Sequence, residues 1–298
     1  MKECAVYHKN TIAPSELILS DQGRIYHINL KADDIADNVI VVGDQERVKQ
    51  VSKHFDSIEF KMAKREFITH TGTYKGLKIT VLSTGIGTDN IDIAINELDA
   101  AVNIDFKTRK IKEKKRKLNI IRIGTSGSLQ EDIPVDSFVA SSYGLGFDGL
   151  LGFYQSLFEN DEIELQEAFK SQINWPKNAN SIYFTRGNNQ LINKIGFDMN
   201  TGITATANGF YGPQGRSLRL ATEVPNLNEQ LNNFHFKNHR ITNFEMETSA
   251  LYGLSAMLGH NACTVCAIIA NRFKKEYSKD YKKTVDQLIE VVLNRLIK

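Results

Sequence analysis

An arginine inside an apolar run and a nearby pair of glycines are the residues best suited to hold an anion. Arg122 follows Ile120 and Ile121 and leads into Gly124-Thr-Ser-Gly127. We predict a strand followed by a glycine turn, because glycines permit positive φ and let backbone N–H groups approach a ligand. A guanidinium in a strand needs compensation, so either a carboxylate or a bound phosphate should face Arg122. A structural arginine–carboxylate pair explains the segment equally well.

A second candidate anion site is the turn 43–47, Gly43-Asp-Gln-Glu-Arg47. It joins the apolar strand expected at 38–42 to a helix expected at 45–55. Such a turn presents N–H groups and the positive end of the helix dipole, and Arg47 adds a cation. An ordinary helix start has the same composition.

The loop 208–216 combines flexible backbone with Phe210, Gln214 and Arg216. An aromatic face, an amide and a guanidinium can together hold a planar heterocycle, by stacking and by hydrogen bonds to its edge. The alternative is a plain glycine-proline turn with a surface arginine.

Two carboxylates, Glu245 and Glu247, stand where a helix ending near Met257 should begin. The helix dipole favours acidic residues there, but Glu247 also suits two vicinal hydroxyls of a sugar. His235 and His239 have the spacing of a helical metal pair, yet no third ligand accompanies them, so we predict no metal site.

Strand, glycine turn and helix recur along the chain, which is typical of an α/β domain with ligands at the carboxyl ends of its strands. Lys75-Gly76 predicts a hairpin, and 143–154 is expected to be a loop. Residues 155–200 show little periodicity. The expected strands are 65–74, 77–84, 135–140, 202–207 and 262–270, with a weaker one at 24–30, and further helices are expected at 91–102 and 285–296.

Composition indicates a globular protein with a large core: 298 residues, 41% of them hydrophobic, and a net charge of +2. That charge favours neither nucleic acid nor membrane, and no apolar run is long enough to cross a bilayer. The segment 107–117 holds eight basic residues and one acid, hence +7, which leaves 2 − 7 = −5 elsewhere. We interpret it as a solvated loop or helix extension, because no aromatic residue interleaves the charges.

The three cysteines, Cys4, Cys263 and Cys266, are too few and too unevenly spaced for a disulfide framework. We therefore expect a cytosolic protein. Cys263-Thr-Val-Cys266 has redox-pair spacing, but its apolar surroundings favour a buried strand.

Seven motifs in sequence resemble those of the nucleoside phosphorylase-I family. They lie at 43–47, 65–67, 83–87, 122–127, 210–216, 245–247 and 271–272. The resemblance covers approximately residues 24–298. It implies an α/β fold with a single domain, in which helices flank a central mixed, twisted sheet. Residues 1–23 would form an N-terminal arm, and 105–118 a basic insertion.

The family resemblance also assigns roles to residues. Phosphate would be held by Gly43, Arg47, Arg122 and Thr125, with Arg65 lent by a neighbouring subunit. Ribose would be held by Met246 and Glu247, with His27 lent by the neighbour. The base would stack on Phe210 and be read by Gln214 and Arg216, with Arg272 nearby. Arg122, Gln214 and Arg216 would be the catalytic set.

The implied activity is phosphorolysis of a nucleoside, with inorganic phosphate as co-substrate and no organic cofactor. Purine-cleaving relatives carry an aspartate after the late strand. Ile269-Ala-Asn-Arg272 offers none, which favours cleavage of uridine to uracil and ribose 1-phosphate. Relatives are homodimers or trimers of such dimers. In some, the glutamate matching Glu66 binds potassium between subunits, but here Asn90 replaces a serine of that site.

Three other readings remain open: a purine phosphorylase or nucleoside hydrolase of the same fold, a non-catalytic nucleoside-binding protein, and a nucleic-acid module built on 107–117. The loop 211–216 also departs from the common family order of glycine and proline.

Overall fold

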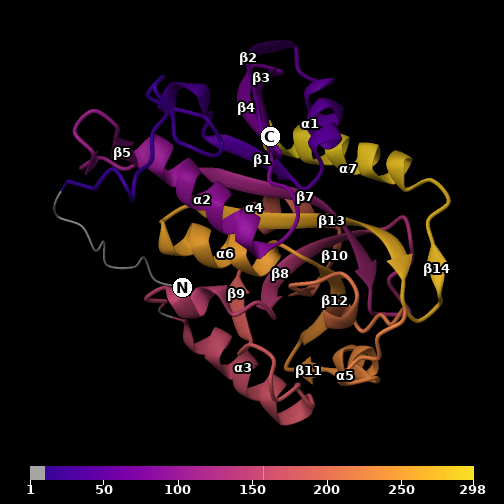
Figure 1. Cartoon of the computed structure of the whole chain (residues 1–298). Helices are drawn as coiled ribbons and strands as arrows, with labels where there is room; N and C mark the ends of the chain where they lie inside the picture. Colours follow the sequence, from indigo (N-terminus) through magenta and orange to yellow (C-terminus); the bar gives the residue numbers. More distant parts are fainter. Residues whose placement is uncertain (1–10, 157) are drawn as a thin grey trace.

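One mixed sheet of twelve strands organises the computed structural model, which describes residues 11–156 and 158–298 (Figure 1). Its strands follow the order β11-β12-β10-β8-β13-β7-β1-β4-β3-β2, with β14 paired to β13 and β9 to β8. The strands are β1 (Asn38–Val42), β2 (Ser57–Lys64), β3 (Phe67–Tyr74), β4 (Leu77–Ser83), β7 (Asn119–Ser128), β8 (Phe138–Gly146), β9 (Tyr183–Arg186), β10 (Asn200–Thr206), β11 (His235–Phe236), β12 (His239–Glu245), β13 (Asn261–Asn271) and β14 (Glu276–Tyr277).

The centre of the sheet is parallel and its edges are not. β4, β1, β7 and β13 run side by side in parallel, whereas β2 and β3 form an antiparallel meander with β4. β12 pairs with both β10 and β7, so β7, β13, β8, β10 and β12 close into a ring. This arrangement confirms the predicted α/β class with a central mixed sheet.

Helices cover both faces of the sheet (Figure 1). α2 and α6 pack on one face with their own apolar cluster, and α1, α4 and α7 pack on the other. α3 and α5 lie at the lower end. The helices are α1 (Gln45–Ser52), α2 (Thr88–Asn103), α3 (Asn160–Gln172), α4 (Asn189–Gly196), α5 (Leu227–Asn233), α6 (Thr248–Met257) and α7 (Tyr281–Leu296), with short 3-10 turns at Ala32–Asp34, Leu150–Phe153 and Gly212–Gln214.

The first strand and helix form as their residue types require. Four of the five residues of β1 are fully buried, as expected for a parallel strand covered on both faces. Asp44 caps α1 by accepting a hydrogen bond from the backbone N–H of Glu46. Lys75 and Gly76 both have positive φ, 48° and 81°, so the predicted hairpin turn is confirmed.

Three predictions about local structure were wrong, and the segment 155–200, for which no elements were predicted, contains several. β7 continues through Gly124 to Ser128, so 124–127 is strand rather than turn. Most of 143–154 is taken up by the end of β8, where Gly144 and Gly146 face close neighbours, and by a 3-10 turn that follows the left-handed Gly149. The weakly periodic 155–200 contains α3, β9 and α4. Residues 24–30 form a compact loop, with one isolated bridge between Leu19 and Ile25.

The basic segment is partly built into the fold. Two-residue strands β5 (Ile104–Asp105) and β6 (Lys110–Ile111) form a hairpin there. Arg109 donates side-chain hydrogen bonds to the carbonyls of Ile12, Ala13 and Leu17. Arg116 likewise donates to the carbonyls of Ala32 and Ile35 and to the carboxylate of Asp37. The interpretation as a solvated segment therefore fails for these two arginines, which tie residues 12–37 to the hairpin.

Arg109→Ala should lower the free energy of unfolding by about 1–3 kcal/mol, since three carbonyls lose a charged donor. Lys114→Ala is the matched control, because Lys114 is exposed in the same segment; it should change stability by less than about 0.5 kcal/mol. Urea unfolding of both variants measures the difference. Equal midpoints would show that the segment does not brace residues 12–17.

The histidine pair and the cysteine pair that the sequence singled out both lie on β-strands. His235 and His239 lie on the short hairpin of β11 and β12, not on a helix. Among the described residues, no three His, Cys, Asp or Glu side chains are grouped as metal ligands. Cys263 and Cys266 are free and buried in β13, and burial raises the pKa of Cys263 to about 12, so the buried-strand prediction is confirmed. Cys4 lies outside the described residues.

Candidate active site

Arg122 on β7 faces two carboxylates. Its side chain is buried, with the residue 5% exposed, and one guanidinium nitrogen bonds Glu247 while the other lies 3.2 Å from Glu245. Burial alone would lower the pKa of Arg122, but the carboxylates of Glu247 and Glu245 outweigh it and raise that pKa. Of the two partners expected for Arg122, the carboxylate is therefore present within the chain.

Arg47, in the first turn of α1, is buried close to Arg122. Its guanidinium donates to the carbonyl of Ile123, at 3.3 Å. Burial lowers the pKa of Arg47, and the positive charge of Arg122 lowers it further. Arg47 forms no ion pair with any residue of 11–156 or 158–298. Arg122 is already paired with two carboxylates, so Arg47 is the guanidinium of the two that is left to bind an anion.

Backbone turns frame this positive region. Gly43 follows β1 directly, and a Cβ on it would lie 3.5 Å from the carbonyl of Gly85, so the turns after β1 and β4 are adjacent. Thr125 is partly buried, three residues beyond Arg122 on β7.

Gly124 and Gly127 make room for arginine side chains. A Cβ on Gly124 would lie 2.0 Å from a terminal nitrogen of Arg122, and one on Gly127 would lie 2.9 Å from Nε of Arg272. Neither glycine has positive φ, so the sequence argument identified important glycines for the wrong reason. Gly124 and Gly127 are three residues apart on β7, a distance of about 10 Å along the strand. That separation is on the scale of a nucleoside.

Glu247 joins the anion site to the start of α6. One carboxylate oxygen accepts from the backbone N–H of Gly87 at 2.8 Å, and the other bonds Arg122. Burial raises the pKa of Glu247, although Arg122 opposes the shift. Met246, next in the chain, is partly buried.

Glu245 is the carboxylate that caps α6. It accepts from the backbone N–H groups of Glu247 and Thr248 and from the hydroxyl of Thr206. The helix-dipole explanation considered for both carboxylates thus applies to Glu245. The sequence showed the pair but not that both meet Arg122.

Three polar side chains gather at the other end of the site. Gln214 is 2% exposed, and its side-chain oxygen accepts from Arg272 at 3.1 Å. Burial lowers the pKa of Arg272 to about 10, and the charge of Arg216 contributes. Nε of Arg272 is buried without a hydrogen-bond partner among the described residues. Two arginines and an amide with a free donor can read a heterocycle rich in carbonyl oxygens.

Phe210 is stacked under Arg216 in this structure. The guanidinium carbon lies 3.6 Å from the ring centroid, and Phe210 itself is 51% exposed. A base that stacks on Phe210 has to displace Arg216 from that face or use the other one.

Arg65 and His27 both approach Tyr26, and the carbonyl of Arg65 accepts a hydrogen bond from Gln45 at the start of α1. Arg65 is exposed in the turn between β2 and β3, and its guanidinium lies 6.0 Å from the ring of Tyr26. His27 contacts Tyr26 and Glu97. Sequence reasoning missed Glu97, since nothing in the helical pattern of α2 separates it from other surface acids.

Glu66 and Asn90 both lie against Gly85, where a Cβ would be 3.2 Å from Cγ of Glu66 and 2.4 Å from Nδ2 of Asn90. The Asn90 amide donates to the carbonyl of Ile86. The Asn90 amide nitrogen, a hydrogen-bond donor, therefore lies near Glu66, the residue that matches the potassium-binding glutamate of some relatives.

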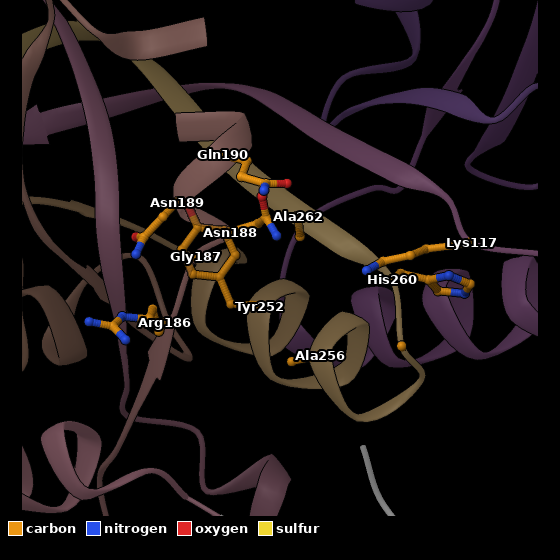
Figure 2. A pocket seen from close by; sticks show the side chains of 11 residues that line it. Lys117, Arg186, Gly187, Asn188, Asn189, Gln190, Tyr252, Ala256, His260 and Ala262 are labelled. Carbon is orange, nitrogen blue, oxygen red and sulfur yellow. The ribbon is translucent and has the colours of Figure 1, made fainter. Parts of the chain in front are cut away.

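A cavity of about 390 Å³ opens at the opposite edge of the sheet (Figure 2). Lys117 and His260, which line it, lie within two residues of the starts of β7 and β13. No residue predicted for the site lines this cavity. Another cavity of similar volume adjoins the base end and is lined by Asn208, Pro213 and Trp175, among others.

Fold and site together define the class: a mixed-sheet α/β protein that gathers arginines and carboxylates at one edge of its sheet. A family model described as the phosphorylase superfamily matches residues 37–298. The chain belongs to the phosphorylase superfamily, in agreement with the motif resemblance. None of the helices among the described residues is long and apolar enough to cross a membrane.

The similar proteins include uridine phosphorylases and purine nucleoside phosphorylases. A uridine phosphorylase of Thermococcus kodakarensis is 32% identical over 270 residues, covering 89% of this chain and 83% of the relative. A purine nucleoside phosphorylase (DeoD-type) of Clostridium perfringens is 26% identical, covering 91% and 98%. Among solved structures, a Trypanosoma brucei nucleoside phosphorylase described as showing uridine phosphorylase activity has a TM-score of 0.86 at 30% identity, covering 94% of this chain and 99% of that one.

Proposed function

We propose that this protein is a uridine phosphorylase, which transfers the ribose of uridine to inorganic phosphate and releases uracil and ribose 1-phosphate. The observation that carries the proposal is the base end of the site, where Gln214, Arg216 and Arg272 converge and Nε of Arg272 is buried with no partner in residues 11–156 and 158–298. Uracil has two carbonyl oxygens that such donors match. The Thermococcus and Trypanosoma relatives support the same substrate.

Phosphate would bind between Arg47 and Arg122, with Gly43 and Thr125 supplying further donors. The two guanidiniums, of which Arg47 has no carboxylate partner among the described residues, would hold the anion and orient one of its oxygens toward the anomeric carbon of ribose. Attack by that oxygen forms the new C–O bond while the bond to N1 of uracil breaks. The bonding electrons move onto uracil.

As the bond to uracil breaks, negative charge develops on uracil and positive charge on ribose, and side chains of the site would stabilise each of them. Gln214 and Arg216, aided by Arg272, would stabilise the negative charge spreading over the uracil carbonyls, as an oxyanion hole does. Glu247 would hold the ribose hydroxyls and face the positive charge that builds on the sugar. We propose that phosphate is a co-substrate and that the arginines supply the stabilisation without an organic cofactor.

We also propose a homo-oligomer, either a dimer or a trimer of dimers, in which Arg65 and His27 complete a neighbour's site. Phe153 and Ile86 are 89% and 67% exposed near the start of α2, and Tyr154 beside them bonds Asp92 of that helix. Exposed apolar side chains so grouped favour a subunit contact. A cytosolic role in pyrimidine salvage fits this activity.

A purine nucleoside phosphorylase is the second candidate, supported by the Clostridium relative. The end of β13 argues against it. The amide of Asn271 donates to the carbonyls of Gln130 and Ile133, and its oxygen accepts from two backbone N–H groups. Asn271 is thus fully used in shaping the turn, at the place where a purine enzyme needs a proton donor.

A panel of uridine, thymidine, inosine and adenosine, each with and without phosphate, tests the proposal. Uracil should appear from uridine only with phosphate, and inosine and adenosine should be poor substrates. Equal release without phosphate would indicate a hydrolase, and preference for inosine or adenosine a purine phosphorylase. Binding of uridine without product would indicate a binding protein, and a gel shift with nucleic acid at physiological salt would point to the basic segment.

A further inference from the structure

Glu97, in the third turn of α2, accepts hydrogen bonds from the segment that carries His27. Its carboxylate accepts from the backbone N–H groups of His27 at 2.9 Å and Ile28 at 2.8 Å, and lies 2.6 Å from Nδ1 of the His27 ring. Glu97 is mostly buried, whereas the His27 side chain is 30% exposed. The acid is therefore internal and the ring faces outward.

These contacts fix the chemistry of the ring. A carboxylate only accepts hydrogen bonds, so Nδ1 of His27 must carry the proton that it donates to Glu97. Nε2 is then the nitrogen left to meet a ligand. Because Glu97 also holds the backbone on both sides of the ring, it sets the direction of Nε2 as well.

His27 contacts α2 well along the helix from the point where its own subunit's Glu247 contacts it. Gly87, at the start of α2, holds Glu247, and Glu97 comes ten residues later, about 15 Å along the helix axis. Asn90, Ile93 and Glu97 recur at helical spacing and so share one side of α2. Ile86, exposed just before the helix, extends this line of residues toward the surface.

We infer that Glu97 is a positioning residue for the neighbouring subunit's ribose site: it fixes the ring that His27 lends across the interface. This inference rests on the proposed function, in which sites are shared between subunits. Glu97 touches no substrate. Its effect on the reaction passes through His27 and appears in the other subunit.

Steady-state kinetics of Glu97→Ala and Glu97→Gln measure the effect. Losing a charged hydrogen bond that orients the ring should raise the KM for uridine about tenfold. The KM for phosphate should stay within about twofold, since Arg47 and Arg122 are untouched. In a His27→Ala background the substitution at Glu97 should have no further effect on uridine KM.

Asp99→Asn is the matched control on the same helix. Asp99 also faces a histidine, with one oxygen 3.2 Å from Nε2 of His260, but that pair is internal. Asp99→Asn should leave the KM for uridine unchanged even if thermal stability falls. A rise in uridine KM that matches Glu97→Ala would show that any lost carboxylate on α2 has the same effect, and would overturn the inference.

Mixed dimers distinguish action across the interface from action within a subunit. One subunit carries Glu97→Gln and the other Arg216→Ala, each with its own purification tag. The first subunit has an intact base site and receives His27 from a partner whose Glu97 is intact. The mixed dimer should therefore show about half the wild-type turnover, with the wild-type KM for uridine.

A raised KM in this mixed dimer would overturn the inference, because Glu97 would then act on its own subunit's site. A control dimer of His27→Ala with Arg216→Ala tests the sharing itself. Recovery in the control alone would reject the role of Glu97 and leave the proposed function standing. Failure of the control would reject shared sites, and the inference with them, while phosphate-dependent uridine cleavage would still stand on the substrate panel.

Discussion

Arg122→Ala should lower kcat/KM for uridine phosphorolysis by about 10²–10³ and destabilise the fold at the same time. The catalytic loss follows because Arg122 is one of two buried guanidiniums proposed to hold phosphate. The structural loss follows because Glu245 and Glu247 would remain buried without their shared cation. Removing one partner of a buried pair typically costs about 3–5 kcal/mol.

The destabilisation of Arg122→Ala should grow as pH rises. Burial already raises the pKa of Glu247, and without Arg122 the folded carboxylate would hold its proton more tightly still. A group whose folded pKa lies above its unfolded value, about 4.3 for glutamate, stabilises the fold at low pH and loses that contribution as pH rises through the folded pKa. Thermal unfolding between about pH 5 and 8 measures this slope.

Arg122→Lys is the companion variant. Lysine restores the charge but not the planar fork that spans two carboxylates, so stability should recover more than activity. Full activity in Arg122→Lys, or no loss in Arg122→Ala, would contradict the assignment of phosphate to this arginine.

Arg216→Ala should lower kcat/KM for uridine by about 10²–10³ while the fold survives. The Arg216 side chain lies on the exposed ring of Phe210 and donates only to the Phe210 carbonyl among the described residues, so little packing is lost. The affinity for phosphate should be unchanged, because the substitution leaves Arg47, Arg122 and the contacts of these two residues intact.

Arg219→Ala is the control for Arg216→Ala. Arg219 is an exposed arginine three residues beyond the loop 208–216, and its removal should leave uridine turnover within about twofold and stability within about 0.5 kcal/mol. Nucleoside turnover and circular dichroism of both variants give the comparison. Arg216→Ala that retained wild-type uridine turnover would remove the base-reading role of the loop.

The sequence was most informative where one local rule decides the structure. Four continuous apolar residues before Gly43 predicted a buried strand, and Lys75-Gly76 predicted a tight hairpin, because burial and positive φ depend here on local residue types. The order and spacing of the family motifs also identified Arg47 and Arg122, which the fold brings close together, and Gln214, which it places beside Arg272.

Long-range packing explains what the sequence could not give. Gly124 looked like a turn residue, but the glycine is needed because the Arg122 side chain folds over it within β7. The hydrogen bond between His27 and Glu97 joins residues that are 70 positions apart, so no local sequence pattern predicts it. Likewise Arg109 and Arg116 look like solvated charges until their carbonyl acceptors on residues 12–35 are known.

A crystal structure with phosphate and a non-cleavable uridine analogue tests the central claim most directly. The account predicts the anion between Arg47 and Arg122, the ribose hydroxyls on Glu247, and the uracil carbonyls within hydrogen-bond distance of Gln214 and Arg216. Phosphate bound away from Arg47 and Arg122, or Gln214 turned to solvent beside a fully occupied site, would contradict it.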